Sequence, residues 1–221
     1  MITKLKRGLL VAIEGIDGSG KSTLARTLAE QFEGQNITTI LTREPGGSQL
    51  GKSLRTILQH QEKPLSPIAE FLLFAADRAQ HFKEVVVPAL NEKKLVISDR
   101  LSDSSLVYQG FGKGVDRTMI AQVNEWAMQS IKPDLVIYVR IDAQTARERL
   151  LARGKKLTSF EKEASEFTQR LIDGFETLYA NTKNVIIVDG TFSPHELATF
   201  TFNQINVWLT SNHRITDSAK F

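Results

Sequence analysis

Short apolar runs alternate with segments of helical periodicity along the whole chain. Five of these runs are rich in aliphatic and β-branched residues and have the length of buried strands: residues 9–13, 37–42, 95–97, 135–139 and 185–188. Between them, apolar residues recur three and four apart, which predicts helices. Strands that alternate with helices form parallel sheets covered on both faces. The pattern therefore predicts a three-layer α/β/α fold around a five-stranded parallel sheet.

Capping residues predict where several helices begin. Ser66 before Pro67, and Ser193 before Pro194, each place a capping side chain ahead of a proline in the first turn. Glu196 completes a capping box with Ser193. The helix that follows residue 66 is apolar nearly all round, so we expect it to be buried.

The chain has no internal repeat and no linker that would divide it. We interpret residues 1–210 as a single domain with a small helical lid at about 148–161, and the polar, aperiodic residues 211–221 as a frayed tail. The segment with Gly110, Gly112 and Gly114 is expected to be a loop.

Composition narrows the class of protein. The 221 residues are 41% hydrophobic, which suits a globular domain, and the net charge is only +3. Basic residues form no block that would indicate nucleic acid. The chain has no cysteine, which suits a reducing cytoplasm. The first apolar run has five residues, too short for a signal or membrane segment. We therefore expect a cytoplasmic protein that binds neither nucleic acid nor membrane.

The segment 15–22 matches the phosphate-loop pattern G-x-x-x-x-G-K-[ST]. It follows the first predicted strand and opens a helix, the context that the motif requires; the alternative is a glycine turn without a ligand. Backbone N–H groups of such a loop surround a phosphate, and Lys21 reaches the outer phosphates of a nucleotide. The candidate phosphate-binding residues are Gly15, Ile16, Asp17, Gly18, Ser19, Gly20, Lys21, Ser22 and Thr23. With the predicted sheet, they indicate the P-loop NTPase fold.

Charged residues follow the neighbouring strands where these strands end. Asp99 ends an apolar strand, from which it can hold Mg²⁺ together with the Ser22 hydroxyl. Asp142, the competing carboxylate, is interpreted as a helix cap. Arg43 and Arg100 end two strands and suit an anion at this edge of the sheet, although a single exposed arginine is usually only a solvated charge.

Phe74 and Arg78 are four residues apart and share one helix face, with His81 nearby. An aromatic ring beside a guanidinium suits a nucleobase, which stacks on the ring and accepts a hydrogen bond at a carbonyl. The alternative is a core phenylalanine beside a surface arginine.

Five cations lie within ten residues: Arg147, Arg149, Arg153, Lys155 and Lys156. A solvated helix face is the ordinary interpretation of such a run. A cationic flap that closes over phosphates is the alternative, because phosphoryl transfer depends on neutralising charge and excluding water.

Taken in order, the segments 14–18, 42–47, 73–78, 98–100 and 108–110 resemble the motifs of the thymidylate kinases, a family of nucleoside monophosphate kinases. The resemblance extends over most of the chain, and Arg-Glu-Pro-Gly-Gly with Phe-Ala-Ala-Asp-Arg is its most specific part. It implies transfer of the γ-phosphate of ATP to dTMP, with Mg²⁺, by a homodimer. It also implies a cis peptide before Pro45.

The resemblance implies a role for each matching residue. Phe74 stacks on thymine, Arg78 addresses its O4 edge, and Ser105 and Gln109 lie near the base. Tyr108 packs against the sugar. The implied dTMP-binding residues are Asp17, Arg43, Phe74, Arg78, Arg100, Ser105, Tyr108 and Gln109, and the implied catalytic residues are Lys21, Arg100, Asp17 and Arg153.

The phosphate loop departs from one branch of this family. Gly18-Ser19 carries no charge where some relatives have an arginine, so the chain is similar to the bacterial type, in which flap cations compensate. Before the flap glutamate, this chain has the segment 158–161 in place of the usual Asp-Arg, and Lys155 or Lys156 is the candidate substitute. The remaining alternatives are a kinase for another nucleotide or a deoxynucleoside, and a nucleotide-dependent switch or binding protein. For a GTP switch, 182–185 lacks the Asp of a guanine-reading motif.

Overall fold

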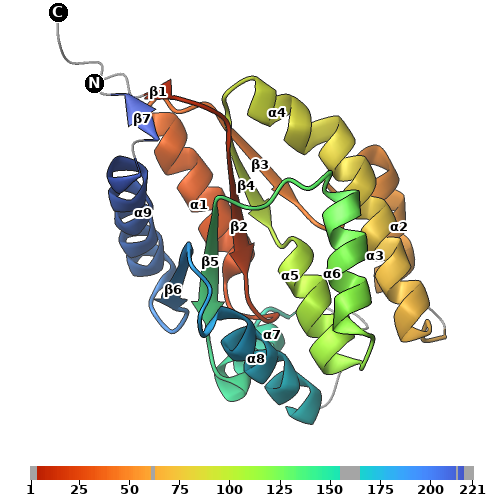
Figure 1. Cartoon of the computed structure of the whole chain (residues 1–221). Coiled ribbons are helices and arrows are strands. Elements are labelled where there is room, and N and C mark those ends of the chain that lie inside the picture. Colours follow the sequence, from red (N-terminus) through yellow and green to blue (C-terminus); the bar gives the residue numbers. More distant parts are fainter. Residues whose placement is uncertain (1–3, 61–62, 155–164, 213, 217–221) are drawn as a thin grey trace, which may run out of the picture.

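A computed structural model describes residues 4–60, 63–154, 165–212 and 214–216 (Figure 1). Five parallel strands form the central sheet in the order β3-β4-β2-β5-β6. Their bounds are β2 Leu9–Glu14, β3 Thr39–Arg43, β4 Leu95–Asp99, β5 Leu135–Arg140 and β6 Val185–Asp189. All five predicted strands are confirmed, and so is the α/β class.

Helices connect consecutive strands, as the periodicity predicts. They are α1 Lys21–Gly34, α2 Gln49–Gln59, α3 Pro67–His81, α4 Val87–Asn91, α5 Ser102–Ser105, α6 Arg117–Ala127, α7 Ala143–Ala152, α8 Ser165–Tyr179 and α9 Pro194–Ser211. Two π-helical segments, η1 Phe82–Val86 and η2 Leu106–Gly112, continue α3 and α5. The Ser66 cap and the capping box of Ser193 with Glu196 are present, and Asp142 caps α7 as predicted.

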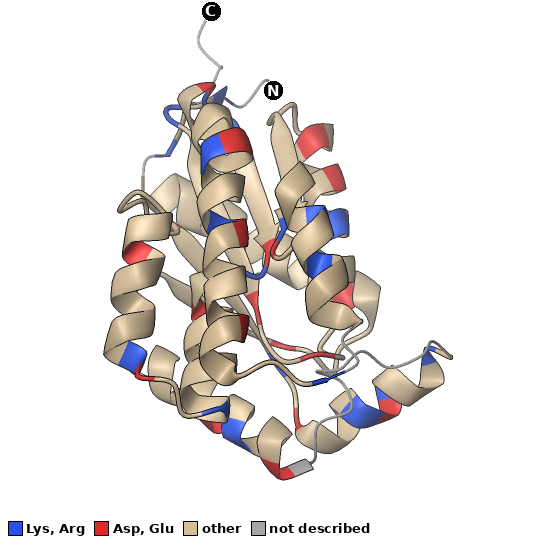
Figure 2. Ribbon diagram, turned by 90° about the vertical axis from the view of Figure 1, so that its right-hand side faces the viewer, with Lys and Arg blue, Asp and Glu red and all other residues tan. Residues whose placement is uncertain are grey.

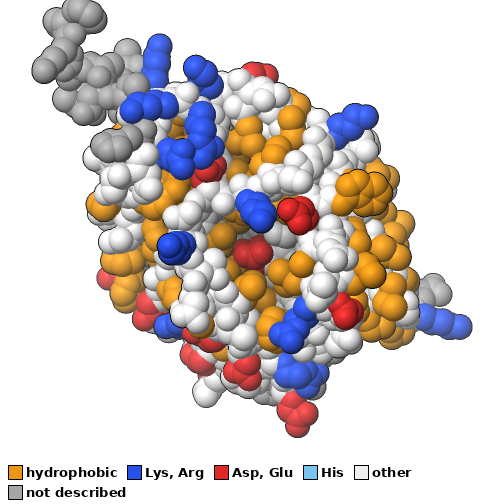
Figure 3. Space-filling model, viewed as in Figure 1, with side chains coloured by type: hydrophobic (Ala, Val, Ile, Leu, Met, Phe, Trp, Pro, Cys, Tyr) orange, Lys and Arg blue, Asp and Glu red, His pale blue; other side chains and the backbone are white. Residues whose placement is uncertain are grey.

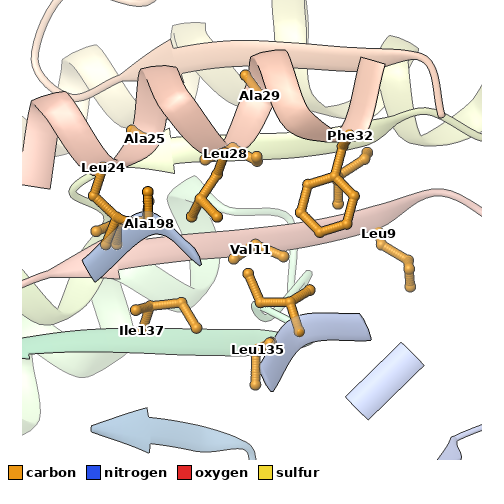
Figure 4. Close-up of a cluster of buried hydrophobic side chains, with 14 of the residues drawn as sticks. Leu9, Val11, Leu24, Ala25, Leu28, Ala29, Phe32, Leu135, Ile137 and Ala198 are labelled. Carbon is orange, nitrogen blue, oxygen red and sulfur yellow. The ribbon is translucent and has the colours of Figure 1, made fainter. Parts of the chain in front are cut away.

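Alternate residues of each strand enter two separate cores because successive side chains point to opposite faces of the sheet. Leu9 and Val11 of β2 pack with Leu28 and Phe32 of α1 and with residues of α9 (Figure 4). Leu10 of β2 belongs to the other core, under η1, η2 and α8. The sheet is therefore covered on both faces, and its carboxyl edge stays open for a site.

The helix after Ser66 differs from its prediction. Phe71 of α3 is buried against α6, but Ile68 and Leu72 are 61% and 52% exposed. The prediction of a wholly buried helix is wrong because α3 lies in the outer layer of helices. Only one side of α3 packs on its neighbours, and the other carries an exposed apolar stripe.

The segment with Gly110 and Gly112 is helical rather than a loop, because both lie in η2. Close packing favours glycine there, since a Cβ on Gly112 would lie 2.7 Å from the ring of Phe167. Gly114 alone follows the helix, with a positive φ of 74°.

The tail is also more ordered than expected. Ser211 ends α9, and β7 Ile215–Thr216 pairs antiparallel with β1 Lys4–Leu5 in a two-stranded ribbon. The prediction of a frayed tail is therefore wrong for residues 211, 212 and 214–216. Residues 213 and 217–221 lie outside the described residues. Pairing between the two chain ends cannot be detected in either segment alone. Within the described residues, no helix is both long and apolar enough to cross a bilayer.

Candidate functional site

A cavity of about 660 Å³ opens at the carboxyl edge of the sheet. Its walls come from the loop after β2, the ends of β3 and β4, helices α2, α3 and α7, and η2. In the strand register, Asp99 lies opposite both Ile13 and Arg43, so the ends of three strands meet here. On the side shown in Figure 2, positions of both charge signs lie on the loops and along the helices.

The phosphate loop depends on glycine at positions where a side chain would be strained. Gly18 and Gly20 have φ values of 86° and 99°, and a Cβ on Gly18 would lie 2.5 Å from the carbonyl oxygen of Ala146. Helix α1 begins directly after Gly20 without a side-chain cap. Its first N–H groups and its dipole therefore face the loop and suit an anion.

Lys21 turns back onto this loop. Its Nζ donates to the carbonyl oxygen of Ile16 at 2.5 Å and to Oγ of Ser19 at 3.3 Å. Burial, followed by the nearby charge of Arg100, lowers the pKa of Lys21 to about 8. A buried ammonium with a lowered pKa gains more from a polyphosphate than a solvated lysine would.

Ser22 and Asp99 meet as the sequence predicts. The Ser22 hydroxyl donates a hydrogen bond to Oδ2 of Asp99. One hydroxyl and one carboxylate are hard oxygen donors, which suit Mg²⁺ that is also held by phosphates and water. No cluster of three or more His, Cys, Asp or Glu residues able to hold a metal occurs among the described residues. The Ser22 and Asp99 oxygens fit a magnesium ion that arrives with a nucleotide.

Asp17, Arg100 and Tyr108 form one hydrogen-bonded group. Nη2 of Arg100 donates to Oδ1 of Asp17 at 2.6 Å and to the Tyr108 hydroxyl at 3.2 Å, while the guanidinium lies over the Tyr108 ring. Burial alone would raise the pKa of Asp17, but the charges of Arg100 and Lys21 outweigh burial and lower it. Asp17 therefore stays ionised and holds Arg100 at the cavity wall.

Glu14 supports this group from below and was not predicted from the sequence. Its side chain is fully buried, and its carboxyl group accepts from the Ser104 hydroxyl at 2.6 Å and from the Leu101 N–H at 2.8 Å. The same hydroxyl accepts from Nη1 of Arg100 at 2.9 Å. Burial, and then the charge of Asp103, raise the pKa of Glu14 to about 8. The one feature of the sequence that could have indicated Glu14 is its position as a carboxylate at the end of an apolar strand.

Arg78 is 1% exposed, yet it lines the cavity. Its Nε donates to Glu44 at 2.8 Å and Nη1 to Asn124 at 2.6 Å, while Nη2 donates to the Leu101 carbonyl oxygen and to Ser105 at 3.2 and 3.3 Å. A guanidinium has five N–H groups, so these four bonds to described residues leave one N–H on Nη1 for a ligand.

Arg55 is a cavity residue that sequence reasoning missed, and Glu44, to which it assigned no role, also lines the cavity. Glu44 is buried between Arg78 and His81. Nδ1 of His81 lies 2.9 Å from Oε1 of Glu44. The peptide before Pro45 is cis, as the resemblance implies. The carbonyl oxygen of Pro45 itself accepts from Nη1 of Arg55 at 2.9 Å. Arg55 lines the cavity from α2. Its position was hidden because α2 reaches the site only through tertiary packing.

The structure brings together nearly all predicted site residues. Those that line the cavity are Asp17, Gly18, Gly20, Lys21, Ser22, Thr23, Arg43, Phe74, Arg78, Asp99, Arg100, Ser105, Tyr108, Gln109 and Arg153. Gly15, Ile16 and Ser19 belong to the loop but not to the lining. Arg149 also lines the cavity, although its Nη1 donates to the Gly190 carbonyl oxygen. Lys155, Lys156 and segment 158–161 lie outside the described residues.

A glycine loop after the central strand, and a cavity that continues from it past an aromatic ring, define a P-loop nucleotide-binding protein. A family model described as thymidylate kinase matches residues 13–200. The chain belongs to the thymidylate kinase family.

Individual relatives agree with this assignment. The chain is 43% identical over 175 residues to a thymidylate kinase of Pelotomaculum thermopropionicum, covering 79% of this chain and 81% of that protein. It is 40% identical over 191 residues to one of Carboxydothermus hydrogenoformans, covering 86% and 93%. The crystal structure of a thymidylate kinase from Ehrlichia chaffeensis matches with a TM-score of 0.71 and 31% identity, over 92% of this chain and 99% of that one.

Proposed function

We propose that this protein transfers the γ-phosphate of ATP to dTMP and releases dTDP and ADP, a step toward dTTP. The observation that carries the proposal is the single cavity that joins the phosphate loop to Phe74 and Arg78, with Arg43 and Arg100 also in its wall. A cavity of about 660 Å³ with these groups suits two nucleotides placed end to end.

The acceptor nucleotide occupies the part of the cavity toward α3. Thymine stacks on Phe74, and the remaining N–H of Arg78 donates to its O4. Ser105 and Gln109 face the base, and Tyr108 packs against the sugar, whose 3′-hydroxyl meets Asp17. Arg43 and Arg100 hold the acceptor phosphate. Arg55 adds a further cation to the same cavity wall. Burial and then the charge of Arg43 lower the pKa of Arg55, and a bound phosphate would offset both effects.

The donor phosphates bind at the loop of residues 15–23. Backbone N–H groups at the start of α1 and the ammonium of Lys21 neutralise them. Ser22 and Asp99 are the residues that would hold Mg²⁺ with the donor phosphates. When bound, this ion supplies charge neutralisation on the transferring phosphoryl group.

The reaction needs positioning more than acid–base chemistry. An ionised oxygen of the acceptor phosphate attacks the γ-phosphorus, the bond between that phosphorus and the β-phosphate oxygen breaks, and ADP leaves. Because the attacking oxygen carries no proton, the protein needs no general base. Arg100 and Lys21 stabilise the charge that spreads over the transferring group. Arg153, on the exposed wall of the cavity, adds a cation from the lid side.

We also propose a homodimer. Helices α2, α3 and α6 carry exposed apolar side chains on the outside of the helical layer, seen at the right of Figure 3. They include Leu50, Ile57, Ile68, Leu72, Met119 and Trp126, the last of which is 84% exposed. An apolar surface of this kind on a folded protein favours association with a second copy. A cytoplasmic location, without nucleic acid or membrane as partner, completes the proposal, and the lack of cysteine supports it.

A coupled assay of ADP release tests the activity. The protein is incubated with ATP, Mg²⁺ and one of dTMP, dUMP, dCMP, dGMP or AMP. We expect dTMP to give the highest kcat/KM. Phe74→Ala should raise the KM for dTMP by about fivefold to a hundredfold, because loss of base stacking costs ~1–3 kcal/mol. A higher kcat/KM with another monophosphate would contradict the assignment.

A further inference from the structure

One face of α3 carries Glu70, Phe74 and Arg78 at intervals of four residues, so all three lie on the same side of the helix. Phe74 and Arg78 line the cavity, whereas Glu70 lies behind its wall and is 4% exposed. Oε1 of Glu70 accepts a hydrogen bond from Nε2 of Gln109 at 2.7 Å. Its Oε2 accepts from Nζ of Lys113 at 2.9 Å.

The carboxylate of Glu70 determines which way the Gln109 amide faces. A carboxylate in an ion pair only accepts hydrogen bonds, so it selects the NH₂ group of the amide and turns the carbonyl oxygen away. Gln109 is 1% exposed and lines the cavity, which leaves its side chain little freedom. No group in the described part of the chain donates to Oε1 of Gln109. The carbonyl oxygen Oε1 of Gln109 is therefore available as a hydrogen-bond acceptor for a ligand in the cavity.

We propose that Glu70 is a positioning residue for base selection, which fixes Gln109 so that its carbonyl oxygen accepts the N3–H of a 4-oxopyrimidine. This inference rests on the proposed function. With a donor from Arg78 at O4 and an acceptor from Gln109 at N3–H, the site matches thymine. Cytosine presents the reverse pattern, an amino group at C4 and an acceptor at N3, and so meets a mismatch at both positions.

The substitution Glu70→Gln tests this role. A neutral amide at position 70 can either donate or accept, so Gln109 can present its NH₂ group to the cavity. The variant is compared with wild type on dTMP and on 5-methyl-dCMP, which keeps the methyl group and differs at positions 3 and 4. We expect the dTMP preference in kcat/KM to fall by about tenfold, mainly through KM, as one hydrogen bond to the base loses its fixed direction.

Two controls separate positioning from general structure. Lys113→Arg changes the other partner of Glu70 but keeps its positive charge and the bond to Gln109, and we expect its base preference to stay within about threefold of wild type. In a Gln109→Ala background, adding Glu70→Gln should leave the base preference unchanged, because Glu70 acts through Gln109. If Glu70→Gln alone folds poorly, Gln109→Ala by itself is compared with wild type: loss of the acceptor should lower the dTMP preference, and an unchanged preference would overturn the inference.

An unchanged preference in folded Glu70→Gln, or an equal loss in Lys113→Arg, would overturn the positioning role. Binding constants of the two nucleotides, measured by calorimetry without ATP, give a readout that does not depend on turnover. If wild type fails to prefer dTMP at all, the proposed function itself is wrong, and that result is distinct from failure of the Glu70 inference.

Discussion

At the scale of single residues, the cavity is lined or supported by ionisable groups whose pKa values are shifted by burial and by neighbouring charges. Glu14, Lys21 and Asp17 all interact electrostatically with Arg100, but their pKa values shift in different ways. Desolvation prevails at Glu14 and Lys21, and the neighbouring cations prevail at Asp17. The carboxyl group of Glu14, next to the cavity, is therefore neutral, whereas that of Asp17 in the cavity wall is ionised.

The raised pKa of Glu14 predicts how stability depends on pH. The folded protein keeps this proton up to about pH 8, whereas the unfolded chain loses it near 4.5. Between these values the folded state binds more protons, so the free energy of unfolding falls as pH rises. Urea unfolding at pH 5.5 and 8 should show wild type losing at least ~1 kcal/mol more than Glu14→Gln. Equal losses in the two proteins would refute a buried neutral Glu14.

A second prediction at this scale concerns the effect of Arg153 on turnover. Arg153→Ala removes a cation from the cavity wall, and we expect kcat for dTMP to fall by roughly tenfold or more. Arg147→Ala is the matched control, since Arg147 lies exposed on the same helix segment but does not line the cavity. Steady-state kinetics that gave the same kcat for both variants would exclude a role for the lid arginine.

At the scale of elements, the loop after β3 is fixed in place by α3. Asp77 accepts from the Gly46 N–H at 3.1 Å, and His81 lies 2.7 Å from the Thr42 hydroxyl. Glu44 joins the same helix through Arg78. The end of β3, which carries Arg43, and the loop after it are thus held by the helix that carries Phe74, so a change in one displaces the other.

Gly47→Ala tests this coupling. The new Cβ would lie 2.4 Å from the His81 ring and 2.7 Å from the Thr42 hydroxyl, so the loop must shift. We expect a loss of ~1–3 kcal/mol in unfolding free energy and a higher KM for dTMP. Gly34→Ala, where nothing lies within 4 Å, should leave both nearly unchanged. Similar thermal melts and kinetics for the two alanine variants would argue against a rigid loop.

At the scale of the whole molecule, two helical layers serve different purposes. Helices α1 and α9 seal one face of the sheet with a continuous core (Figure 4). Helices α2, α3 and α6 lie farther out on the other side and keep an apolar surface exposed. Because α3 has Phe74 and Glu70 on one side and Ile68 and Leu72 on the opposite one, the proposed dimer surface backs directly onto the base-binding helix.

Leu72→Glu tests the dimer. A charge at the centre of the apolar stripe would be buried without a partner on association, so we expect the variant to be monomeric by light scattering at concentrations where wild type is dimeric. Val207→Glu on α9 is the control: Val207 is 61% exposed and lies outside α2, α3 and α6. A dimeric Leu72→Glu, or a monomeric Val207→Glu, would place the interface elsewhere.

Local patterns determined much of this protein without any structure. The five strands, the helix caps at Ser66, Asp142 and Ser193, and the phosphate loop all depend on neighbours within a few residues, and each is where the sequence predicts it. Topology then brought the ends of three strands together, because parallel strands share one carboxyl edge.

Only the tertiary structure decided which buried groups face one another. Three such contacts join residues 39 or more positions apart: Glu14 near Arg100, Glu70 with Gln109, and the pairing of β1 with β7. The sequence gives the type of each residue but not its partner. Likewise, the apolar sequence of α3 could not tell an inner face from an outer one. Burial, polarity and pKa are properties of three-dimensional surroundings, and periodicity within one segment carries no information about the segment that will pack against it.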